Sequence, residues 1–511
     1  MKQIIIKKNR YVDSVTLMAI GDKILKIDGI ENAEVQMGTP ANLQLLQSLG
    51  YITEENIESD DLVMAVTGDT KEHLKLAFSQ IEKILDHRTE EEDEIVYHNI
   101  NDINLLEDEY DLVQISLPGK YAYAEAKKAL DKGLHVFIFS DNVSLSEELA
   151  LKKLGSEKGL LVMGPDCGVG MLNGVCLGAG SIMREGEVGI IAASGSGAQE
   201  VACIIEKCGY GISAIIGTGG RDLYPEIGGV TMLQGMGILE KDEKTKVIVL
   251  VSKLADSNVM EKVLTEADKV KKPVIAIFLG SEESLFLNHK VIPAYSLEAA
   301  ALQACKILNP NGNINIQYTQ EEIDRIVAKE IKQYTRNQKY FRGLYCGGTF
   351  TEEGLIYFSR NLPGTTLYSN LDTKYANKLP DHQTSVGHCI LDMGAEDFTK
   401  DAPHPVFDPG IRIKRLKEEL ADKELAVILL DFITGPGVAQ DPITPIVKII
   451  GNHSGDRHIT YIANICGSYE DPQNIVEKKK LLEDAGVIVT GSSYESARLS
   501  GALMKALEGR N

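Results

Sequence analysis

The sequence predicts an α/β protein built from several parallel sheets. Apolar runs of strand length alternate with amphipathic helical stretches along most of the 511 residues, a pattern typical of sheets covered by helices. Glycine-rich turns follow several of these runs directly, as they do at the strand-to-helix junctions of doubly wound folds. The length suits three or four domains of about 150 residues. We therefore expect an N-terminal Rossmann-like domain followed by two doubly wound, flavodoxin-like domains.

The first domain is expected to span residues 1–185, including an N-terminal extension. Helical stretches such as residues 71–85 and 122–132 separate short apolar runs that are typical of strands. These predicted strands cover residues 33–37, 62–66, 95–97, 112–117, 135–139 and 160–163. Because helix-forming residues lie between them, we expect the strands to pair in parallel.

The second domain is expected to span residues 186–310. It opens with a strand over residues 188–192, a turn over 194–197 and a helix over 198–207. Three further apolar runs predict strands at residues 212–216, 247–251 and 274–278. Residues 311–340 are expected to be a linker helix, because turn-forming residues there give way to a charged, helix-forming stretch.

The third domain, residues 341–511, repeats the plan of the second. Four pairs of segments match in the same order: VGIIAASGSGAQEVACII with GLYCGGTFTEEGLIYFS, KVIVLVSKLADSN with LAVILLDFITGPG, KPVIAIFLG with HITYIANICG, and VIPAYSLEAAALQACKIL with VIVTGSSYESARLSGALMKAL. Chance is the alternative, because any α/β sequence contains apolar strands followed by glycine. The shared order favours duplication. The third domain also carries an insertion, from about residue 362 to residue 409.

Composition excludes several classes of function. The 53 basic and 74 acidic residues give a net charge of −21, so nucleic acid is not an expected partner. The eight cysteines form no CxxC pair, and there is no HExxH sequence, so neither a disulfide framework nor a metal site is expected. No apolar run approaches the roughly 18 residues of a membrane span, and the N-terminus lacks a signal-peptide pattern. We expect a cytoplasmic protein with no membrane partner.

Two glycine-rich loops are candidate phosphate sites. Ser194, Gly195, Ser196 and Gly197 follow a predicted strand and open a helix, whose unpaired N–H groups and positive dipole attract anions. The alternative is a tight turn that needs glycine for its backbone angles. In the third domain, a second loop of the same kind precedes a predicted helix over residues 441–450 and contains Gly435 and Gly437.

A further turn, Gly347–Thr349, precedes a predicted helix over residues 351–359. If the twin domains pack about a pseudo-twofold axis, two helix N-termini face one another and create a site for a doubly charged phosphate. We expect the phosphate to lie between Ser194–Gly197 and Gly435–Gly437. There is no GxGxxG after the first strand and no GxxxxGK[ST], so neither a nicotinamide cofactor nor a P-loop is expected.

Other candidates are a cation, a histidine and a set of strand-end loops. Arg221 follows Gly219 and Gly220 and precedes Asp222, and it is expected either to clamp a substrate carboxylate or to pair with Asp222 on the surface.

His404 lies between two prolines that fix its backbone; we expect a general acid–base or substrate contact, the alternative being a rigid loop with an exposed ring. His388 is expected to be structural. Loops of the first domain are expected to line a nucleotide-type groove with Pro118, Gly119, Ser140, Asp141, Asn142, Gly164 and Pro165.

These motifs resemble those of a known superfamily. VGIIAASGSGAQEV followed by GTGGRD resembles the ligase segment of the succinyl-CoA synthetase α subunit, MGPDCG resembles the end of its CoA-binding domain, and LDMGAEDF with LLDFITGPG resembles the β-subunit ligase domain. Across nearly the whole length, YVDSVTLM, MGTPAN, SDNVS and the DMGAEDF…PHP segment are similar to the FdrA family of acyl-CoA-synthetase-like proteins. The resemblance implies a CoA-binding-type first domain and two succinyl-CoA-ligase-type domains.

The resemblance also implies companion subunits from the same operon, an oligomer, and CoA and phosphate as ligands, with CoA at the strand-end loops of the first domain. In some lineages the family is linked to allantoin breakdown and to an oxamate carbamoyltransferase complex. Two features depart from the superfamily pattern. An ATP-grasp domain is absent, and the loop that carries the phosphorylated histidine is shortened, so that His289 is the only histidine there and Lys253 replaces an acidic residue.

Three functions follow as hypotheses. The first is a subunit that transfers an acyl or carbamoyl group to or from phosphate, most sharply the conversion of oxalurate and phosphate to oxamate and carbamoyl phosphate. The second is an ADP-forming acyl-CoA ligase with a separate ATP-grasp partner. The third is a regulatory or scaffold relative that kept the fold and lost its chemistry.

Overall fold

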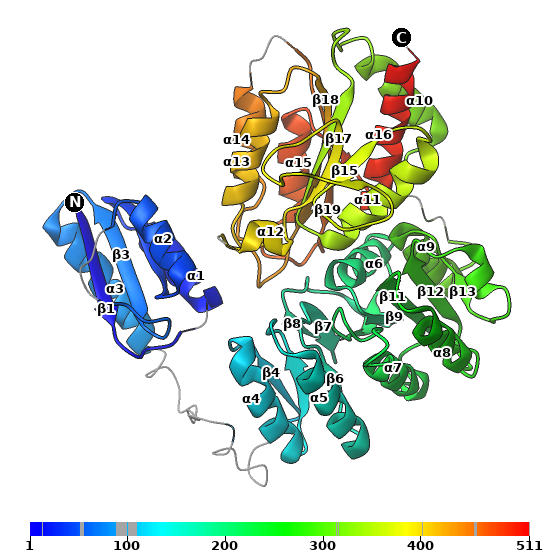
Figure 1. Ribbon diagram of the computed structural model, residues 1–511, viewed down its shortest axis with the longest axis horizontal. Helices are drawn as coiled ribbons and strands as arrows, with labels where there is room; N and C mark the ends of the chain where they lie inside the picture. Colours follow the sequence, from blue (N-terminus) through cyan, green and yellow to red (C-terminus); the bar gives the residue numbers. More distant parts are fainter. Residues whose placement is uncertain are drawn as a thin grey trace. The chain divides into compact units, whose positions relative to one another are not determined.

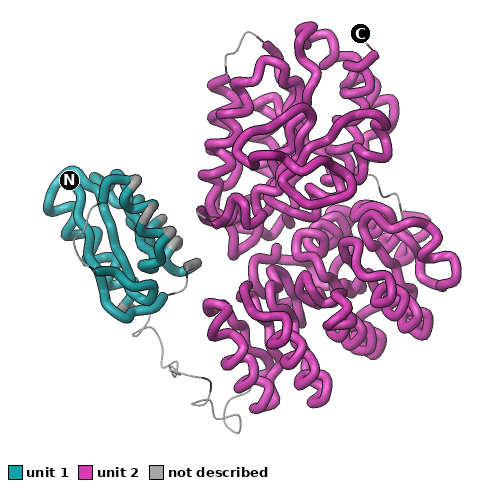
Figure 2. The backbone as a smooth tube through the Cα atoms, in the orientation of Figure 1, with its two compact units in different colours: residues 1–110 teal, residues 111–511 magenta. Residues whose placement is uncertain are grey.

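The computed structural model describes residues 1–12, 14–51, 56–87, 100, 110–312, 314, 316–400, 402–453 and 457–509. The chain divides into two compact units, residues 1–110 and residues 111–511 (Figure 2). Each unit has its own hydrophobic core. The N-terminal extension expected within the first domain is thus a compact unit of its own.

The first unit is a three-stranded sheet with helices. Its strands are β1 (Lys2–Lys7), β2 (Ile30–Met37) and β3 (Leu62–Gly68), and its helices are α1 (Ser14–Ile24), α2 (Pro40–Ser48) and α3 (Lys71–His87). The strand order is β1-β3-β2, and both pairs are antiparallel. The expectation of parallel strands is therefore wrong here. The sequence pattern missed β1, which pairs with a strand about 60 residues further along the chain. The strand expected at residues 95–97 lies outside the described residues.

The second unit begins with a small parallel sheet. Its order is β4-β5-β6, and its strands are parallel, as the sequence predicts. The elements are β4 (Leu112–Ile115), α4 (Gly119–Asp131), β5 (His135–Ile138), α5 (Leu145–Lys158) and β6 (Val162–Met163). A hairpin of β7 (Val169–Leu172) and β8 (Val175–Gly178) follows and joins the edge of the next sheet through an antiparallel pairing of β7 with β10.

A seven-stranded sheet forms the second block. Its order is β13-β12-β11-β9-β10-β7-β8, with β9 to β13 parallel. The elements are β9 (Glu185–Ala192), α6 (Gly195–Lys207), β10 (Ile212–Gly217), α7 (Val230–Lys241), β11 (Val247–Lys253), α8 (Ser257–Ala267), β12 (Val274–Leu279), η2 (Glu283–Phe286), β13 (Ile292–Pro293) and α9 (Leu297–Leu308).

A second seven-stranded sheet, with the order β16-β15-β17-β14-β18-β19-β20, forms the third block. The elements are α10 (Gln320–Glu330), β14 (Tyr340–Tyr345), α11 (Gly348–Asn361), β15 (Leu367–Ser369), β16 (Asn377–Lys378), β17 (His388–Asp392), α12 (Glu396–Thr399), α13 (Gly410–Glu419), β18 (Leu425–Ile433), α14 (Thr444–Asn452), β19 (Thr460–Cys466), α15 (Ile475–Asp484), β20 (Ile488–Thr490) and α16 (Ser493–Glu508). The expected linker helix, α10, packs against α16 and buries Ile323.

The strand orders confirm the internal repeat. The series β13-β12-β11-β9-β10 corresponds to β20-β19-β18-β14-β17, read in the same direction across each sheet. The loop after β10, GTGGRD, then matches the loop after β17, DMGAED. This fifth matching segment falls inside residues 362–409, so that stretch is only partly an insertion. Its additional part is β15 and β16, which extend the sheet.

The two blocks meet through their helices. Helices α6, α9, α11 and α16 contact one another, and Figure 1 shows α6 and α11 where the two sheets approach. One hydrophobic core is continuous across this boundary and includes Val201, Ala300, Leu355 and Leu499. The carboxyl ends of β9 and β14 lead directly into α6 and α11, so the junction brings two helix N-termini together.

Candidate functional site

The N-terminus of α6 carries three small residues after its cap. Ser194 is the N-cap, and its hydroxyl accepts a hydrogen bond from the Gly197 amide at 3.0 Å. Helix α6 begins at Gly195, three residues earlier than the sequence predicts. The amides of Gly195 and Ser196 therefore belong to the first turn, where N–H groups have no partner within the helix.

The N-terminus of α11 faces this turn. The Ser194 hydroxyl lies 2.5 Å from that of Thr349, and the Ser196 hydroxyl donates to Thr349 at 3.1 Å. Thr349 is the second residue of α11. The helix N-terminus that faces α6 is therefore that of α11, in place of the expected loop of Gly435 and Gly437, and three hydroxyl groups converge between the two helices.

A buried carboxylate holds the backbone before α11. Asp431, in β18, accepts hydrogen bonds from the amides of Cys346 and Gly347 at 2.8 and 2.9 Å. The Arg412 guanidinium lies 3.5 Å from the same carboxylate. This acid therefore occupies the two N–H groups that immediately precede α11.

Lys253 and Asp392 complete the surroundings of the facing helix ends. A Cβ at Gly348 would lie 2.5 Å from Asp392 Oδ2 and 3.6 Å from Lys253 Nζ, so glycine is what lets both side chains approach α11. Lys253 Nζ is 3.2 Å from the Glu352 carboxylate and is partly exposed. Burial raises the pKa of Asp392 to about 6, against the opposing effect of Lys253. A cation and an acid that titrates near neutrality therefore lie beside Thr349.

His404 lies close to the loop after β17. Its Nε2 atom is 2.3 Å from the position of a Cβ at Gly394, and its Nδ1 atom accepts a hydrogen bond from the Val406 amide at 3.2 Å. Burial lowers the pKa of His404 to about 4, which makes the ring neutral at pH 7. With Nδ1 engaged as an acceptor, the proton of the neutral ring is on Nε2. The fixed imidazole expected from the flanking prolines is therefore half-buried, and its role stays a prediction.

Gly435 and Gly437 have a packing role in the structure. A Cβ at Gly435, whose φ is 151°, would lie 2.8 Å from the Gly180 carbonyl oxygen, and one at Gly437 would lie 2.9 Å from that of Gly178. The Gly435 amide donates to the Gln473 side chain at 3.1 Å. Helix α14 begins only at Thr444, so this loop does not open a helix directly. The Gly435 amide is therefore already engaged and is not free to donate to a phosphate.

The GTGGRD loop is tied to the first block by ion pairs. Arg221 Nη2 lies 2.8 Å from Glu148 and donates to the Val143 carbonyl at 2.8 Å, so its partner is not the expected Asp222. Asp222 is fully buried; it pairs with Lys152 at 2.7 Å and accepts hydrogen bonds from the second and third amides of α7. The structure therefore gives Asp222 a structural role in place of the expected substrate contact.

Gly219 and Gly220 lie in the same loop. Gly219 has a φ of +82°, and a Cβ there would lie 2.3 Å from the Pro165 carbonyl oxygen. The loop thus packs directly on the Gly164–Pro165 turn, and Gly219 meets a positive-φ requirement that favours glycine. A substrate role for these two glycines stays a prediction.

The strand-end loops of the first block do come together. A Cβ at Gly119 would lie 2.1 Å from the Asp141 carbonyl oxygen, and the Asp166 amide donates to the Ser140 carbonyl at 2.9 Å. Asn142 has a φ of 54°, and Pro118 caps α4 without a side-chain hydrogen bond. Burial, followed by repulsion from Asp141, raises the pKa of Asp166 to about 6. These loops form one surface, as the sequence predicts for parallel strands.

His289 is held by two acids. Its Nδ1 atom lies 2.8 Å from Asp268, and its Nε2 atom lies 3.4 Å from Glu261. Burial lowers the pKa of His289, but the two carboxylates outweigh this effect and raise the pKa above its ordinary value. Both ring nitrogens are therefore already engaged.

Sequence reasoning missed Asp392, and it assigned no ligand contact to Lys253 or Thr349. Asp392 is the first residue of the DMGAED loop. The match of this loop with GTGGRD was the available signal, because it places Asp392 at the carboxyl end of a strand of the repeat. Lys253 ends β11 next to β9, so its position was predictable from strand order alone. The hydroxyl contacts of Thr349 depend on the packing of two blocks, for which no local sequence signal exists.

Comparison with known proteins gives three family matches and a full-length relative. Residues 1–98 match the AllF heavy metal-associated domain, residues 183–280 the CoA binding domain, and residues 344–503 the CoA-ligase family. The uncharacterized protein YahF of Escherichia coli is 37% identical over 507 residues, covering 98% of each chain.

Two relatives match part of the chain. The ADP-forming sulfoacetate-CoA ligase subunit SauD of Bilophila wadsworthia is 27% identical over 36% of this chain and 64% of that subunit. The ADP-forming succinate–CoA ligase α subunit 1 of Archaeoglobus fulgidus is 26% identical over 36% of this chain and 63% of that subunit. Both relatives are named as subunits of ADP-forming CoA ligases.

The residues of the first unit do not fit a thiolate metal site. Residues 1–110 contain no cysteine, and the described residues of the chain hold no group of three His, Cys, Asp or Glu side chains arranged to bind an ion. Within the same described residues, no helix has the length and apolarity needed to cross a membrane.

The CoA-binding match begins at residue 183, so it covers the second block and leaves out the strand-end loops of the first. CoA as a cofactor or substrate fits the two CoA-related matches, whereas its contact residues stay a prediction. The matched domains and the parallel sheets identify an acyl-CoA-synthetase-type, succinyl-CoA-ligase-like protein. The full-length similarity to YahF and the ordered domain matches show that the chain belongs to the FdrA-like family of CoA-ligase-type proteins.

Proposed function

We propose that the chain is the subunit of a multi-protein enzyme that binds an acyl or carbamoyl phosphate between α6 and α11. In its sharpest form the reaction converts oxalurate and phosphate to oxamate and carbamoyl phosphate. The observation that carries this proposal is the convergence of the Ser194, Ser196 and Thr349 hydroxyls at two facing helix N-termini. Lys253 adds a positive charge beside them.

The phosphate contacts follow from the groups that remain open. The Gly195 and Ser196 amides, at the positive end of α6, donate to phosphate oxygens, and the three hydroxyls turn their protons toward the same anion. Lys253 Nζ, already near α11, balances the second negative charge. Preorganised donors of this kind stabilise a dianion without reorganisation during the reaction.

Group transfer requires one proton movement. A phosphate oxygen attacks the carbamoyl carbon of oxalurate, the C–O bond forms, and the bond from that carbon to the oxamate nitrogen breaks. The proton of hydrogen phosphate ends on that nitrogen, so atoms and charge balance. Asp392, with its pKa raised to about 6, and His404, neutral at pH 7, are the groups near this site that relay the proton.

Arg221 is the group proposed for the substrate carboxylate. Its guanidinium is partly exposed and pairs with Glu148, which also lies 2.9 Å from Lys152. Glu148 therefore keeps one cation when Arg221 turns toward a ligand, so the exchange leaves no buried acid unpaired.

The test is carbamoyl transfer by the chain together with its operon neighbours. Oxamate and carbamoyl phosphate are supplied, and formation of oxalurate and phosphate is followed. Lys253→Met and Ser196→Ala are expected to lower kcat/KM for carbamoyl phosphate about tenfold to a hundredfold, because each removes a phosphate contact. Lys271→Met, at an exposed site, is the matched control. Absence of transfer by the complete set removes the specific reaction.

A second candidate is a subunit of an ADP-forming acyl-CoA ligase. It is supported by the CoA-binding and CoA-ligase matches and by relatives named as ADP-forming CoA ligase subunits. In this case the N-terminus of α4, capped by Pro118 without a side-chain hydrogen bond, is the group on this chain that suits a CoA phosphate. A rise in melting temperature with CoA, but not with pantetheine, supports it, and no shift at millimolar CoA counts against it.

A further inference from the structure

A pocket lies at the amino ends of strands in the third-block sheet, whereas Thr349 lies at the carboxyl end of β14. Its volume is about 610 Å³, and it opens where β14, β15 and β17 begin. The six residues of β14 separate this end of the sheet from the start of α11, a length of about 20 Å at 3.3 Å per residue. The proposed phosphate site involves none of the residues that line this pocket.

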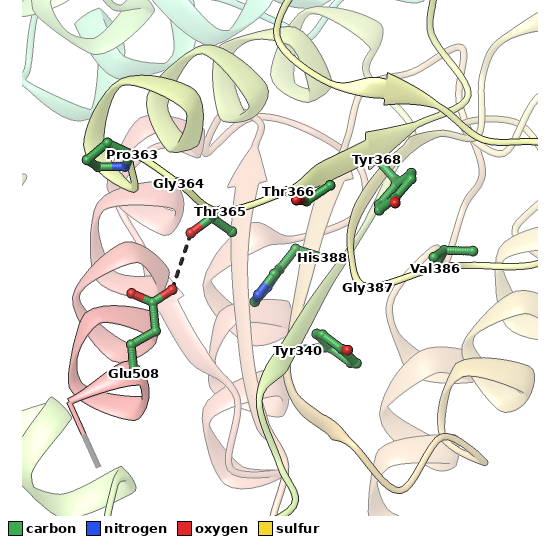
Figure 3. Close-up of a pocket in the computed structure, with 10 residues that line it drawn as sticks. All are labelled: Tyr340, Pro363, Gly364, Thr365, Thr366, Tyr368, Val386, Gly387, His388 and Glu508. Carbon is green, nitrogen blue, oxygen red and sulfur yellow. Dashed lines mark hydrogen bonds between the residues drawn. The ribbon is translucent and has the colours of Figure 1, made fainter. Parts of the chain in front are cut away.

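Aromatic rings form the walls of the pocket. Tyr340, Tyr368 and His388 line it, and Figure 3 shows their rings around one space. The ring of His388 packs edge-on against Tyr340 at 5.2 Å and lies 4.9 Å from Phe341. These ring contacts fix the imidazole, so the wall is preformed and suited to the flat face of a ligand.

His388 has an incomplete set of hydrogen bonds. Its Nδ1 atom is buried and has no partner among the described residues. Burial, reinforced by the charge of Arg342, lowers the pKa of His388 to about 4, so the ring is uncharged at pH 7. A neutral imidazole in this wall offers hydrogen-bonding capacity that the protein itself does not use.

The opposite side of the pocket is acidic. Glu508, at the end of α16, accepts a hydrogen bond from the Thr365 hydroxyl at 3.2 Å, drawn as a dashed line in Figure 3. Glu508 is the one charged side chain among the ten lining residues, and Thr366 adds a second hydroxyl. Among the lining residues this carboxylate is the acceptor for N–H donors, whereas Lys339 and Arg342 lie over the Tyr340 ring at 4.9 and 5.4 Å.

We propose that this pocket binds a flat, uncharged nitrogen heterocycle of nucleobase size that carries N–H donors. The ring of the ligand stacks against Tyr368 and His388, its N–H groups donate to Glu508, and His388 pairs with a ring nitrogen or N–H group. Because β14 and α11 both run between this pocket and Thr349, the ligand binds without competing for the phosphate site.

Adenine is the probe, and the full chain is titrated with it by calorimetry. Saturable binding at or below millimolar concentration is expected, with no binding of benzoate, which has a flat ring but a negative charge. Glu508→Gln is expected to weaken adenine binding at least fivefold, whereas Glu483→Gln, at an exposed site on α15, leaves it unchanged. Adding inorganic phosphate is expected to leave the dissociation constant unchanged.

The proton resonances of the His388 ring provide the second readout. They are assigned by their loss in His388→Gln and are expected to shift on adenine addition. The proposal is overturned if adenine does not bind by millimolar concentration, if Glu508→Gln binds it as tightly as the unaltered chain, or if the His388 resonances do not move. Competition with phosphate would place the ligand at the other site and would also overturn it.

Discussion

Glu200 in α6 accepts a hydrogen bond from the backbone amide of Ser493, the first residue of α16, at 2.8 Å. The same contact recurs in the other direction, because Glu353 in α11 accepts from the amide of Leu297, the first residue of α9, also at 2.8 Å. Each glutamate is the sixth residue of its helix. Each repeat thus supplies a buried acid that stabilises the helix N-terminus of the other.

Glu353→Gln is expected to change how stability depends on pH. Burial, opposed by the hydrogen bonds from Ser493 and Leu297, raises the pKa of Glu353 to about 8. A group with a raised folded-state pKa stabilises most below its unfolded pKa, and this contribution is lost as pH rises toward 8. The unaltered chain should therefore lose up to about 1.4 kcal/mol per pH unit relative to the variant between pH 5 and 8.

Thermal unfolding from pH 5 to pH 9 measures this difference. The amide of the variant keeps an acceptor for Leu297 and a donor for the Ser493 hydroxyl, so its fold is expected to be retained. Glu470→Gln, at an exposed site, is the control and should parallel the unaltered chain. Parallel curves for Glu353→Gln and the unaltered chain would show that Glu353 is ionised throughout.

Lys152→Ala is expected to destabilise the second unit strongly. Lys152 is fully buried between Glu148 and Asp222, at 2.9 and 2.7 Å. Removing it leaves two buried acids with less compensation, which costs about 3–5 kcal/mol for a broken buried pair. Denaturant unfolding measures the loss, and Lys153→Ala, on the exposed face of the same helix, should change stability by less than about 0.5 kcal/mol.

Asp392→Asn is expected to remove a pH dependence of anion binding. Sulfate is the probe, because it keeps its charge over the whole range. In the unaltered chain, affinity should fall several-fold from pH 5 to pH 7, since ionised Asp392 repels an anion near Lys253 and Thr349. Calorimetry on Asp392→Asn should give a constant affinity. Asp397→Asn, exposed on α12, should behave as the unaltered chain, and a pH-independent unaltered chain would contradict the assignment.

Gly435→Ala is expected to lower stability by about 1–3 kcal/mol. The new Cβ would lie 2.8 Å from the Gly180 carbonyl oxygen, and the φ of 151° disfavours any L side chain. Gly451→Ala, in α14 where nothing lies within 4 Å, is the matched control and should be neutral or stabilising by up to about 1 kcal/mol. Denaturant unfolding compares the two, and equal effects would refute a close-packed Gly435.

The parts of the fold that repeat a local pattern were predictable from sequence. Apolar runs located β9 and β18, because strand hydrophobicity is a local property, whereas the start of α6 was predicted three residues too late. The charged stretch of α10 was interpreted as a linker helix, because its composition does not show that Ile323 is buried against the core.

Long-range pairing explains the remaining differences. The strand β1 was missed because its pairing with β3 has no local signal, and the antiparallel sheet depends on it. One of the two expectations for Arg221 was a pair with its neighbour Asp222, but Glu148 reaches Arg221 from a helix about 70 residues earlier. Only the packing of separate elements decides which charged groups meet.

The exchange of helix-stabilising acids between the repeats has a consequence for dividing the chain. Neither half, expressed alone, holds every partner that its own buried glutamate and terminal helix require. A gene split between Leu308 and Gln320 would therefore yield two polypeptides that fold when co-expressed and aggregate when produced separately.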